Sequence, residues 1–108
     1  MKSYHDYQQC IEACLRCAAL CQHCATSCTR EQEIQMMADC IRLDMECAAL
    51  CYAAAQLMSM GSESSRDLCR ICAEACRRCA AECSRHDNEH CRECAEACRV
   101  CAEQCSNM

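Results

Sequence analysis

The sequence predicts an all-α protein, folded as an antiparallel up-down four-helix bundle with a cysteine-lined core. The chain of 108 residues has no proline, one glycine and neither Phe nor Trp, and residues that favour helices dominate. The β-branched and aromatic residues that strands favour are scarce. Nineteen cysteines recur at alternating steps of three and four residues, a spacing that places side chains along one stripe of an α-helix.

The cysteine repeat occurs in three clear copies. Residues 69–83 and 91–105 both read C-x2-C-x3-C-x2-C-x3-C, and residues 14–28 carry the same pattern, which Cys10 extends by one step. Because no cysteine lies off the helical stripes, we expect every thiol to project into one shared core. The candidate metal ligands are Cys10, Cys14, Cys17, Cys21, Cys24, Cys28, Cys40, Cys47, Cys51, Cys69, Cys72, Cys76, Cys79, Cys83, Cys91, Cys94, Cys98, Cys101 and Cys105.

A fourth, degenerate copy of the repeat lies at residues 37–51. Met37 and Asp44 stand at two positions where the other copies have cysteine. Met37 is either a thioether ligand or an ordinary core residue. Asp44 either faces solvent at a gap in the bundle or serves as an oxygen ligand or proton acceptor beside the thiols, because a buried carboxylate requires partners.

Two long helices are expected in the N-terminal half. The first spans about residues 4–29, and Ser3 with Asp6 has the spacing of a capping box at its start. The cysteine stripe then changes phase near residues 29–33, which predicts a tight turn, and Thr29 with Gln32 has the spacing of a capping box. The second helix is expected over about residues 31–58.

Two shorter helices, which carry the clear copies of the repeat at residues 69–83 and 91–105, are expected in the C-terminal half. Residues 59–65 have the composition of a loop, and Ser64 with Asp67 has the spacing of a cap for the next helix. A one-position slip between the last two stripes predicts a chain reversal, with Asp87 as N-cap of the final helix. Short loops favour an antiparallel bundle in which residues 1–108 form one domain.

Composition argues against several classes of protein. The net charge is −5 and there is no basic patch, which argues against binding to nucleic acid. No apolar run approaches the ~20 residues that a membrane-spanning helix requires. The N-terminal residues lack the apolar stretch of a secretory signal, so we expect a cytoplasmic protein with reduced thiols. An odd number of cysteines also cannot pair completely within one chain.

A core lined with thiols indicates metal binding. A purely apolar core would use Leu or Ile, which fill more space than Cys. Neighbouring cysteines on one helix do not converge as a disulfide requires. Ferredoxin-type iron–sulfur proteins use loop cysteines followed by proline, whereas this chain has no proline and places its cysteines on expected helices.

Zinc and Cu(I) are the main candidate metals. Zinc favours four thiolates, and each such site carries two negative charges that no Lys or Arg on the stripes would offset. Cu(I) is soft, prefers thiolates and accepts two or three of them. Replacing each thiol proton by one Cu(I) leaves the charge unchanged, so the sequence favours on the order of 19 Cu(I) ions, one per thiolate.

The chain resembles the cytosolic bacterial copper storage proteins over its whole length. The resemblance rests on the four copies of the repeat, at residues 14–28, 37–51, 69–83 and 91–105. This resemblance implies a four-helix bundle lined by cysteines, storage of many Cu(I) ions inside each bundle, assembly into tetramers and no catalytic turnover. The missing signal sequence matches the cytosolic branch of that family.

The expected partners are copper ions, a copper chaperone, and further copies of the chain in a homo-tetramer. The second helix has two apolar flanks outside its stripe, and such flanks suggest contact with another subunit. The residues of these flanks are Ile34 and Ile41 on one side and Leu43, Leu50 and Leu57 on the other.

The two ends of the expected bundle differ in composition. His86 and His90 precede the last stripe, and they either relay incoming Cu(I) to the thiols or remain solvated. The antiparallel layout places at their end Cys28, Met37, Cys40, Cys83 and Cys91. It places at the opposite end Cys10, Cys51, Met58, Met60, Cys69, Cys105 and Met108.

The leading hypothesis is a cytosolic protein that stores and detoxifies Cu(I). A metallothionein-like buffer of zinc or other thiophilic metals is the alternative, and an Fe–S electron-transfer protein is a third. Colour separates Fe–S from the other two, and the ratio of metal to thiol separates copper from zinc. We do not expect this protein to be an enzyme. Its sequence shows no nucleophile–base pair with a pocket, and a filled core leaves no cavity for a substrate.

Overall fold

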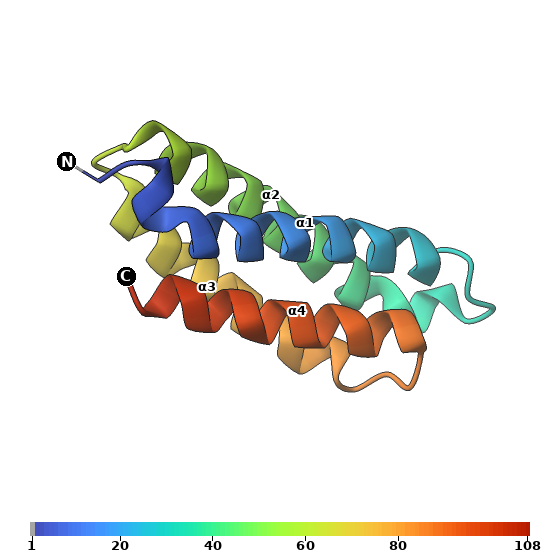
Figure 1. The fold of residues 1–108 in the computed structure, drawn as a ribbon. Helices are drawn as coiled ribbons and strands as arrows, with labels where there is room; N and C mark the ends of the chain where they lie inside the picture. Colours follow the sequence, from blue (N-terminus) through green and yellow to red (C-terminus); the bar gives the residue numbers. More distant parts are fainter. Residues whose placement is uncertain (1) are drawn as a thin grey trace.

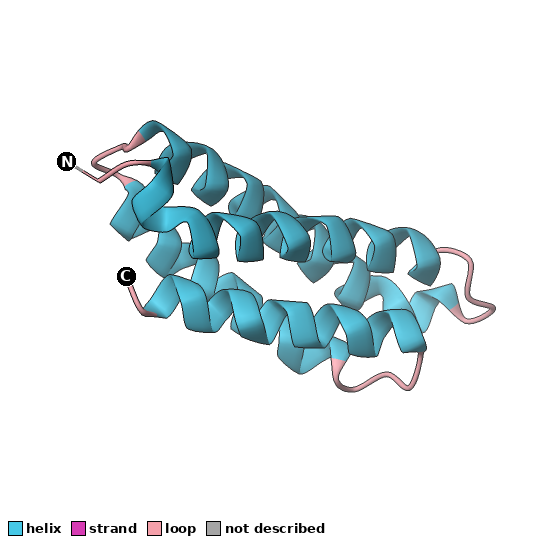
Figure 2. Ribbon diagram, viewed as in Figure 1, coloured by secondary structure: helices cyan, strands magenta, loops and turns pink. Residues whose placement is uncertain are grey.

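Four helices form an antiparallel up-down bundle in the computed structural model, which describes residues 2–108 (Figure 1). Within these residues there is no strand, and loops are confined to the ends of the bundle (Figure 2). The bundle measures 49 × 18 × 17 Å, and each helix packs beside its neighbours in the order α1, α2, α3, α4. The predicted fold class is confirmed. The helices are α1 (Gln8–Cys28), α2 (Ala38–Met60), α3 (Ser65–Cys83) and α4 (Glu89–Ser106).

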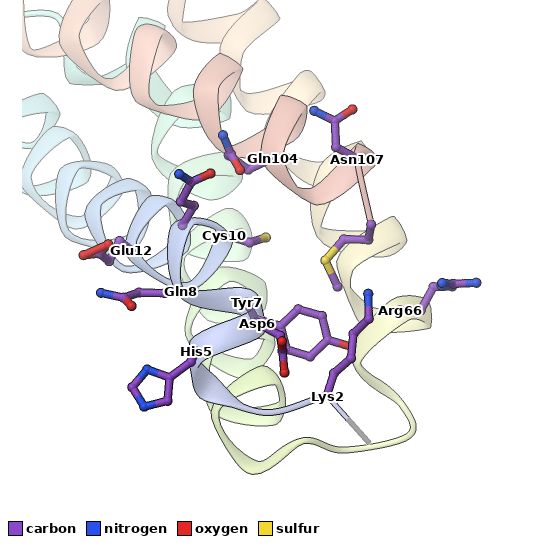
Figure 3. Close-up of a pocket in the computed structure, with 12 residues that line it drawn as sticks. Lys2, His5, Asp6, Tyr7, Gln8, Cys10, Glu12, Arg66, Gln104 and Asn107 are labelled. Carbon is purple, nitrogen blue, oxygen red and sulfur yellow. The ribbon is translucent and has the colours of Figure 1, made fainter.

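The predicted capping box at the N-terminus is confirmed. The backbone N–H of Ser3 donates a hydrogen bond to Oδ2 of Asp6 over 2.8 Å. The first turn, however, is a 3-10 helix, η1 (Tyr4–Tyr7), and α1 begins only after it. This turn lies at the same end of the bundle as the start of α3, so that Tyr7 and Lys2 face Arg66 (Figure 3).

The expected start of the second helix at residue 31 is wrong. Residues 29–33 form a turn, a 3-10 helix η2 (Ile34–Met37) follows, and α2 begins at Ala38. The Thr29 hydroxyl donates backward to the carbonyl of Thr26 over 2.6 Å, so it extends the end of α1 instead of capping a new helix.

The two predicted caps of the C-terminal half have different outcomes. Ser64 is the N-cap residue of α3, as predicted, but its side chain makes no capping hydrogen bond, and Asp67 instead pairs with Arg70 over 3.0 Å. The N-cap of α4 is Asn88 and not Asp87. The Asn88 amide donates to Oε1 of Glu31 over 3.0 Å, so this residue ties the α3–α4 loop to the α1–α2 turn.

The core consists mainly of cysteine and alanine. All 19 cysteines are buried, as predicted, and small alanines beside each stripe allow the four helices to approach closely. Leu43 and Leu50, which we expected to face another subunit, are half-buried and pack partly against this core.

Gly61 sets the geometry of the turn between α2 and α3. It ends α2 with φ of 68°, and a Cβ atom at this position would lie 2.6 Å from the carbonyl oxygen of Lys2. The backbone N–H of Ser62 then donates to the Leu57 carbonyl over 3.0 Å, which completes the helix end. This glycine therefore allows the N-terminal segment to lie directly against the turn.

We predict that Gly61→Ala lowers the free energy of unfolding of the reduced, metal-free protein by at least about 1 kcal/mol, because an L-residue is strained at this φ and its Cβ displaces Lys2. Urea denaturation followed by far-UV circular dichroism measures the change. Ser64→Ala is the matched control and should change stability by less than about 0.5 kcal/mol. Equal effects of the two substitutions would contradict this account of the turn.

Candidate metal centre

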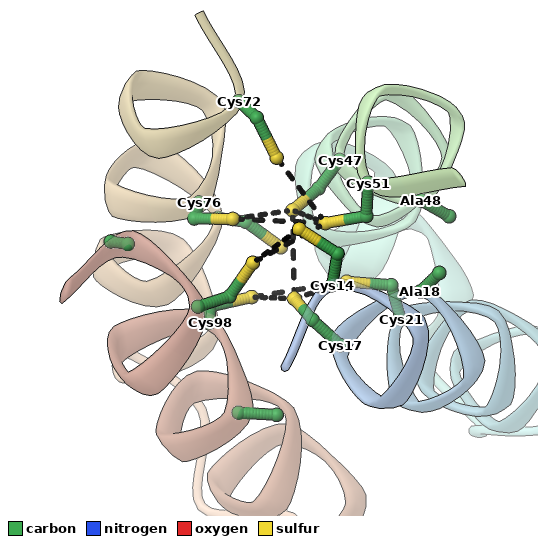
Figure 4. Close-up of a cluster of buried hydrophobic side chains, with 14 of the residues drawn as sticks. Cys14, Cys17, Ala18, Cys21, Cys47, Ala48, Cys51, Cys72, Cys76 and Cys98 are labelled. Atoms are coloured by element: carbon green, nitrogen blue, oxygen red, sulfur yellow. Dashed lines mark hydrogen bonds between the residues drawn. The ribbon is translucent and has the colours of Figure 1, made fainter. Parts of the chain in front are cut away.

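The cysteines form a column of sulfur atoms along the axis of the bundle. Thiols contact one another both along a helix and across the core (Figure 4). Sγ of Cys17 lies 3.9 Å from Sγ of Cys21 on the same helix and 3.7 Å from Sγ of Cys98 on α4. Sγ of Cys47 lies 3.5 Å from Sγ of Cys76 on α3. Every helix therefore contributes sulfur to the same column.

Several sets of four thiols are compact enough to hold a metal ion, with ligand atoms within 4.8 Å of one another. Neighbouring sets share cysteines: Cys101 and Cys17 each belong to two sets, as do Cys21 and Cys98. Shared thiols cannot all form separate tetrahedral sites, but they can bridge neighbouring ions. The sets include Cys14, Cys72, Cys101 and Cys105; Cys17, Cys51, Cys76 and Cys101; Cys17, Cys21, Cys47 and Cys98; Cys21, Cys79, Cys94 and Cys98; and Cys24, Cys28, Cys40 and Cys91.

The charge of the core favours a monovalent thiophilic ion. Asp44 and Ser65 are the buried polar or charged residues among residues 2–108, so no Lys or Arg side chain lies in the core to neutralise thiolates. A zinc ion with four thiolates has a net charge of about −2, and several such sites would bury many uncompensated charges. Cu(I) replaces one proton per thiol and leaves the core neutral.

Asp44 is fully buried, so the solvent-facing alternative for this residue is wrong. Its Oδ1 accepts hydrogen bonds from the thiols of Cys79 over 3.1 Å, Cys94 over 3.3 Å and Cys83 over 3.5 Å, and its Oδ2 accepts one from Cys40 over 3.8 Å. The carboxyl group therefore contacts thiols of its own helix, α2, and of the neighbouring helices α3 and α4. Burial and the nearby Cys94 raise the pKa of Asp44 to about 8.

Asp44 also joins two groups of thiols. The contacts among thiols divide the column into a larger group toward the Cys10 end and a smaller group of six cysteines toward the His90 end, while Cys69 contacts Met58. Within residues 2–108 no thiol–thiol hydrogen bond connects the two groups, whereas Asp44 contacts Cys94 of the first and three members of the second. The smaller group comprises Cys24, Cys28, Cys40, Cys79, Cys83 and Cys91.

Two thiols near the His90 end of the column, those of Cys28 and Cys91, are held in their protonated form. Burial, followed by the nearby Cys40, raises the pKa of Cys91 to about 12, and the same causes raise the pKa of Cys28. The thiols of Cys28 and Cys91 are therefore neutral near pH 7 in the metal-free protein. A metal ion that binds there has to displace the thiol proton.

Only one of the two predicted histidines lies against the thiols. Nδ1 of His90 is 3.4 Å from Sγ of Cys24 and 3.5 Å from Sγ of Cys91, and it is 4.0 Å from Sγ of Cys28. His86 instead turns toward Glu82, with its Nε2 2.9 Å from the carboxylate. Met37 is buried at the same end of the core, as predicted.

The opposite end holds a thioether. The Cys69 thiol donates to Sδ of the fully buried Met58 over 3.6 Å. Cys51, which we expected at this end, lies deeper in the column, where its Sγ is 3.6 Å from that of Cys72. Sequence reasoning missed Ser65, a buried residue four positions before Cys69, although continuing the stripe by one step would have found it.

The raised pKa of Asp44 predicts a pH dependence of stability. The folded state retains its proton up to about pH 8, whereas the unfolded state loses it near 3.8, so unfolding becomes easier as pH rises between these values. Relative to wild type, metal-free Asp44→Asn should gain about 1 kcal/mol of stability per pH unit between pH 5 and pH 7.

Urea denaturation of both reduced proteins across this pH range measures the difference, and thiol titration cancels because both proteins carry the same cysteines. Asp39→Asn is the control: this carboxylate is exposed, and its difference from wild type should stay flat with pH. A constant difference for Asp44→Asn as well would contradict a carboxyl that is protonated when buried.

Comparison with known proteins agrees with this geometry. A family model described as copper storage protein matches residues 3–108. The uncharacterized cysteine-rich protein YhjQ of Bacillus subtilis (strain 168) is 45% identical over 90 residues, which are 83% of this chain and 82% of that protein.

Two solved structures have the same fold. The Cu(I)-bound copper storage protein BsCsp3 matches with a TM-score of 0.90 and 44% identity, over 94% of this chain and 95% of the other. The copper storage protein Ccsp from Streptomyces lividans, loaded with 10 copper equivalents, matches with a TM-score of 0.91 and 42% identity, over 94% of this chain and 81% of the other. With its cysteine-lined four-helix bundle, this chain belongs to the copper storage protein family.

Proposed function

We propose that this protein stores Cu(I) inside the bundle, bound by the column of cysteine thiolates. The main observation in support is that 19 free thiols share one buried core with no cationic side chain among residues 2–108. Sulfur atoms 3.5–4.0 Å apart allow one ion to contact thiolates from one helix or from facing helices. The relatives bound to Cu(I) and loaded with copper support the same choice of metal.

The number of ions follows from the charge of the core. Each Cu(I) that replaces one thiol proton adds no net charge, so the column fills without a growing electrostatic penalty. Bridging thiolates satisfy the coordination of every ion. We propose a capacity on the order of 19 Cu(I), about one per thiolate. The protein acts as a store and carries out no catalytic turnover.

Copper enters, in this proposal, at the end where His90 lies against Cys24, Cys28 and Cys91. An imidazole nitrogen is a suitable Cu(I) ligand, and this one lies at hydrogen-bonding distance from two thiols. Asp44 accepts protons or contacts copper deeper in the column. Met37 contributes a thioether to the same end, and His86 holds Glu82 at the rim.

The same proposal covers location and assembly. A copper storage protein from Streptomyces lividans that matches this chain is described as cytosolic, and we propose the cytosol for this protein as well. Among residues 2–108, no helix combines the length and apolar character that crossing a membrane requires. We further propose a homo-tetramer and exchange of copper with a chaperone; the half-buried Leu43, Leu50 and Leu57 are the flank available for subunit contact.

Anaerobic titration of the reduced protein with Cu(I), in competition with a chromophoric chelator, should reach saturation near one copper per cysteine. About one proton per copper should be released into a weakly buffered solution, because neutral thiols become thiolates. The far-UV circular dichroism spectrum should stay helical throughout. Saturation at about one zinc per four cysteines, with copper bound only at a few equivalents, would instead favour the zinc buffer.

His90→Ala should weaken binding of the first copper equivalents roughly tenfold, because a ligand at the end of the column is lost. Total capacity should change by no more than about one ion. Competition with the chelator at low copper loading measures the first effect. His23→Ala, at an exposed position of α1, is the control and should match wild type. A wild-type response of His90→Ala would remove this histidine from the binding site.

A further inference from the structure

A cavity of about 830 Å³ opens at the end of the bundle opposite His90 (Figure 3). It lies between the N-terminal turn η1, the start of α1, the start of α3 and the end of α4. Its volume is within the range of about 300–1,000 Å³ that small-molecule sites commonly have. The lining residues important here are Lys2, Asp6, Cys10, Glu12, Arg66 and Met108.

This cavity reaches the column of thiols. Cys10 forms part of its wall, and a smaller neighbouring cavity of about 290 Å³ includes Cys105. Cys10 and Cys105 are 5% and 3% exposed, whereas every other cysteine is 0% exposed. Sγ of Cys10 lies 3.6 Å from Sγ of Cys105, which lies 3.7 Å from Sγ of Cys14. A continuous path of sulfur therefore leads from the cavity into the core.

The charged groups around the cavity have both signs. Arg66 lines the large and the small cavity, and among residues 2–108 no carboxylate lies within salt-bridge distance of its guanidinium. Lys2 lies nearby with its Nζ 5.8 Å from the centre of the Tyr7 ring. Asp6 and Glu12 supply carboxylates. Such a lining suits a ligand with both anionic and cationic groups, because Arg forms strong paired hydrogen bonds with carboxylates.

We infer that this cavity binds a peptide-like low-molecular-weight thiol, one that carries carboxylates and an ammonium group, and that this thiol exchanges Cu(I) with Cys10. The inference rests on the proposed storage function and assigns to the store a site for exchange with small molecules. Arg66 and Lys2 hold the carboxylates, and Asp6 and Glu12 attract the ammonium group. The thiol then points toward the sulfur of Cys10 at the wall of the cavity.

The exchange is a ligand substitution without change of oxidation state. The sulfur of the incoming thiol binds Cu(I), and the bonds from copper to Sγ of Cys10 and to the neighbouring Cys105 thiolate break. The proton of the incoming thiol passes to the Cys10 thiolate, and Cys105 remains a thiolate bound to the next copper ion. Copper leaves as the Cu(I) complex of the small thiol, and Cys10 remains as a neutral thiol. Copper from Cys14 and Cys105 then refills the Cys10 position along the column, and the proton of Cys10 passes to the thiolate that this copper leaves.

Reduced glutathione is a suitable probe, because it has a thiol, two carboxylates and one ammonium group. Full-length protein loaded with Cu(I) is mixed anaerobically with increasing glutathione, and the rate of copper loss is measured by rapid desalting and metal analysis. The rate should saturate with glutathione concentration. Arg66→Glu should raise the half-saturating concentration about tenfold, as expected for loss of a charged hydrogen bond.

Arg30→Glu is the matched control. Arg30 is exposed in the turn at the His90 end, it has the same charge, and it lies outside the lining of the cavity. This variant should behave as wild type with glutathione. 2-Mercaptoethanol, a thiol without charged groups, should remove copper without saturation and at equal rates from both variants. S-Methylglutathione, which lacks the free thiol, should slow the glutathione reaction competitively.

Copper content measured before mixing separates this inference from the storage proposal. A protein that holds few copper ions contradicts storage itself. If wild type, Arg66→Glu and Arg30→Glu all load fully, the kinetic comparison tests the cavity alone. A non-saturating rate, equal half-saturation in Arg66→Glu and wild type, or an effect of Arg30→Glu alone would each overturn the assignment.

Discussion

The close packing of thiols along one axis is the constraint on which the rest of the structure depends. A sulfur at every inward position of four helices is possible only if the helices stay regular and close together. The chain has no proline to bend them, and alanines beside the cysteines keep the distances across the core short. Sulfur atoms on facing helices consequently lie as close as those one turn apart on the same helix.

The helices and their inward faces could be predicted from the sequence, because the period of three and four residues is a property of each helix alone. All 19 cysteines lie where this period places them. The turns could not be predicted equally well. Asn88 is fixed by Glu31 from a distant turn, and Thr29 bonds back into its own helix. Such contacts depend on the folded chain, so the spacing rules for caps failed at these two turns, although they found the capping box of Ser3 and Asp6.

For Asp44 and the two histidines as well, the sequence predicted the position along the bundle but not the contacts. The stripe put Asp44 at a cysteine position but left open whether it faces solvent. Its burial and its partners Cys79, Cys83 and Cys94, which come from other helices, needed the fold. The two histidines were placed at the right end of the bundle. Which one meets the thiols depends on Glu82, one turn before His86, which draws that ring away. His90, next to Cys91, remains against the core.

Asp44 makes the column chemically uneven. It replaces one sulfur at the junction between the two groups of thiols, and its carboxyl prefers to be protonated there. The thiols on either side of it therefore have an oxygen partner that the others lack. In a column of identical cysteines, an arriving ion would have no preferred binding position. Because Asp44 stands at one cysteine position, the binding positions next to it differ from the others.

The absence of buried Lys and Arg side chains among residues 2–108 has a consequence for how the protein is recognised. Exchange of protons for monovalent ions in the core leaves the outer surface, with its net charge of −5, the same in the empty and the full protein. Neither solubility nor long-range attraction to other molecules then reports how much metal is inside. A partner that distinguishes the two states has to do so where sulfur comes closest to solvent, at the end of the bundle that holds Cys10 and Cys105.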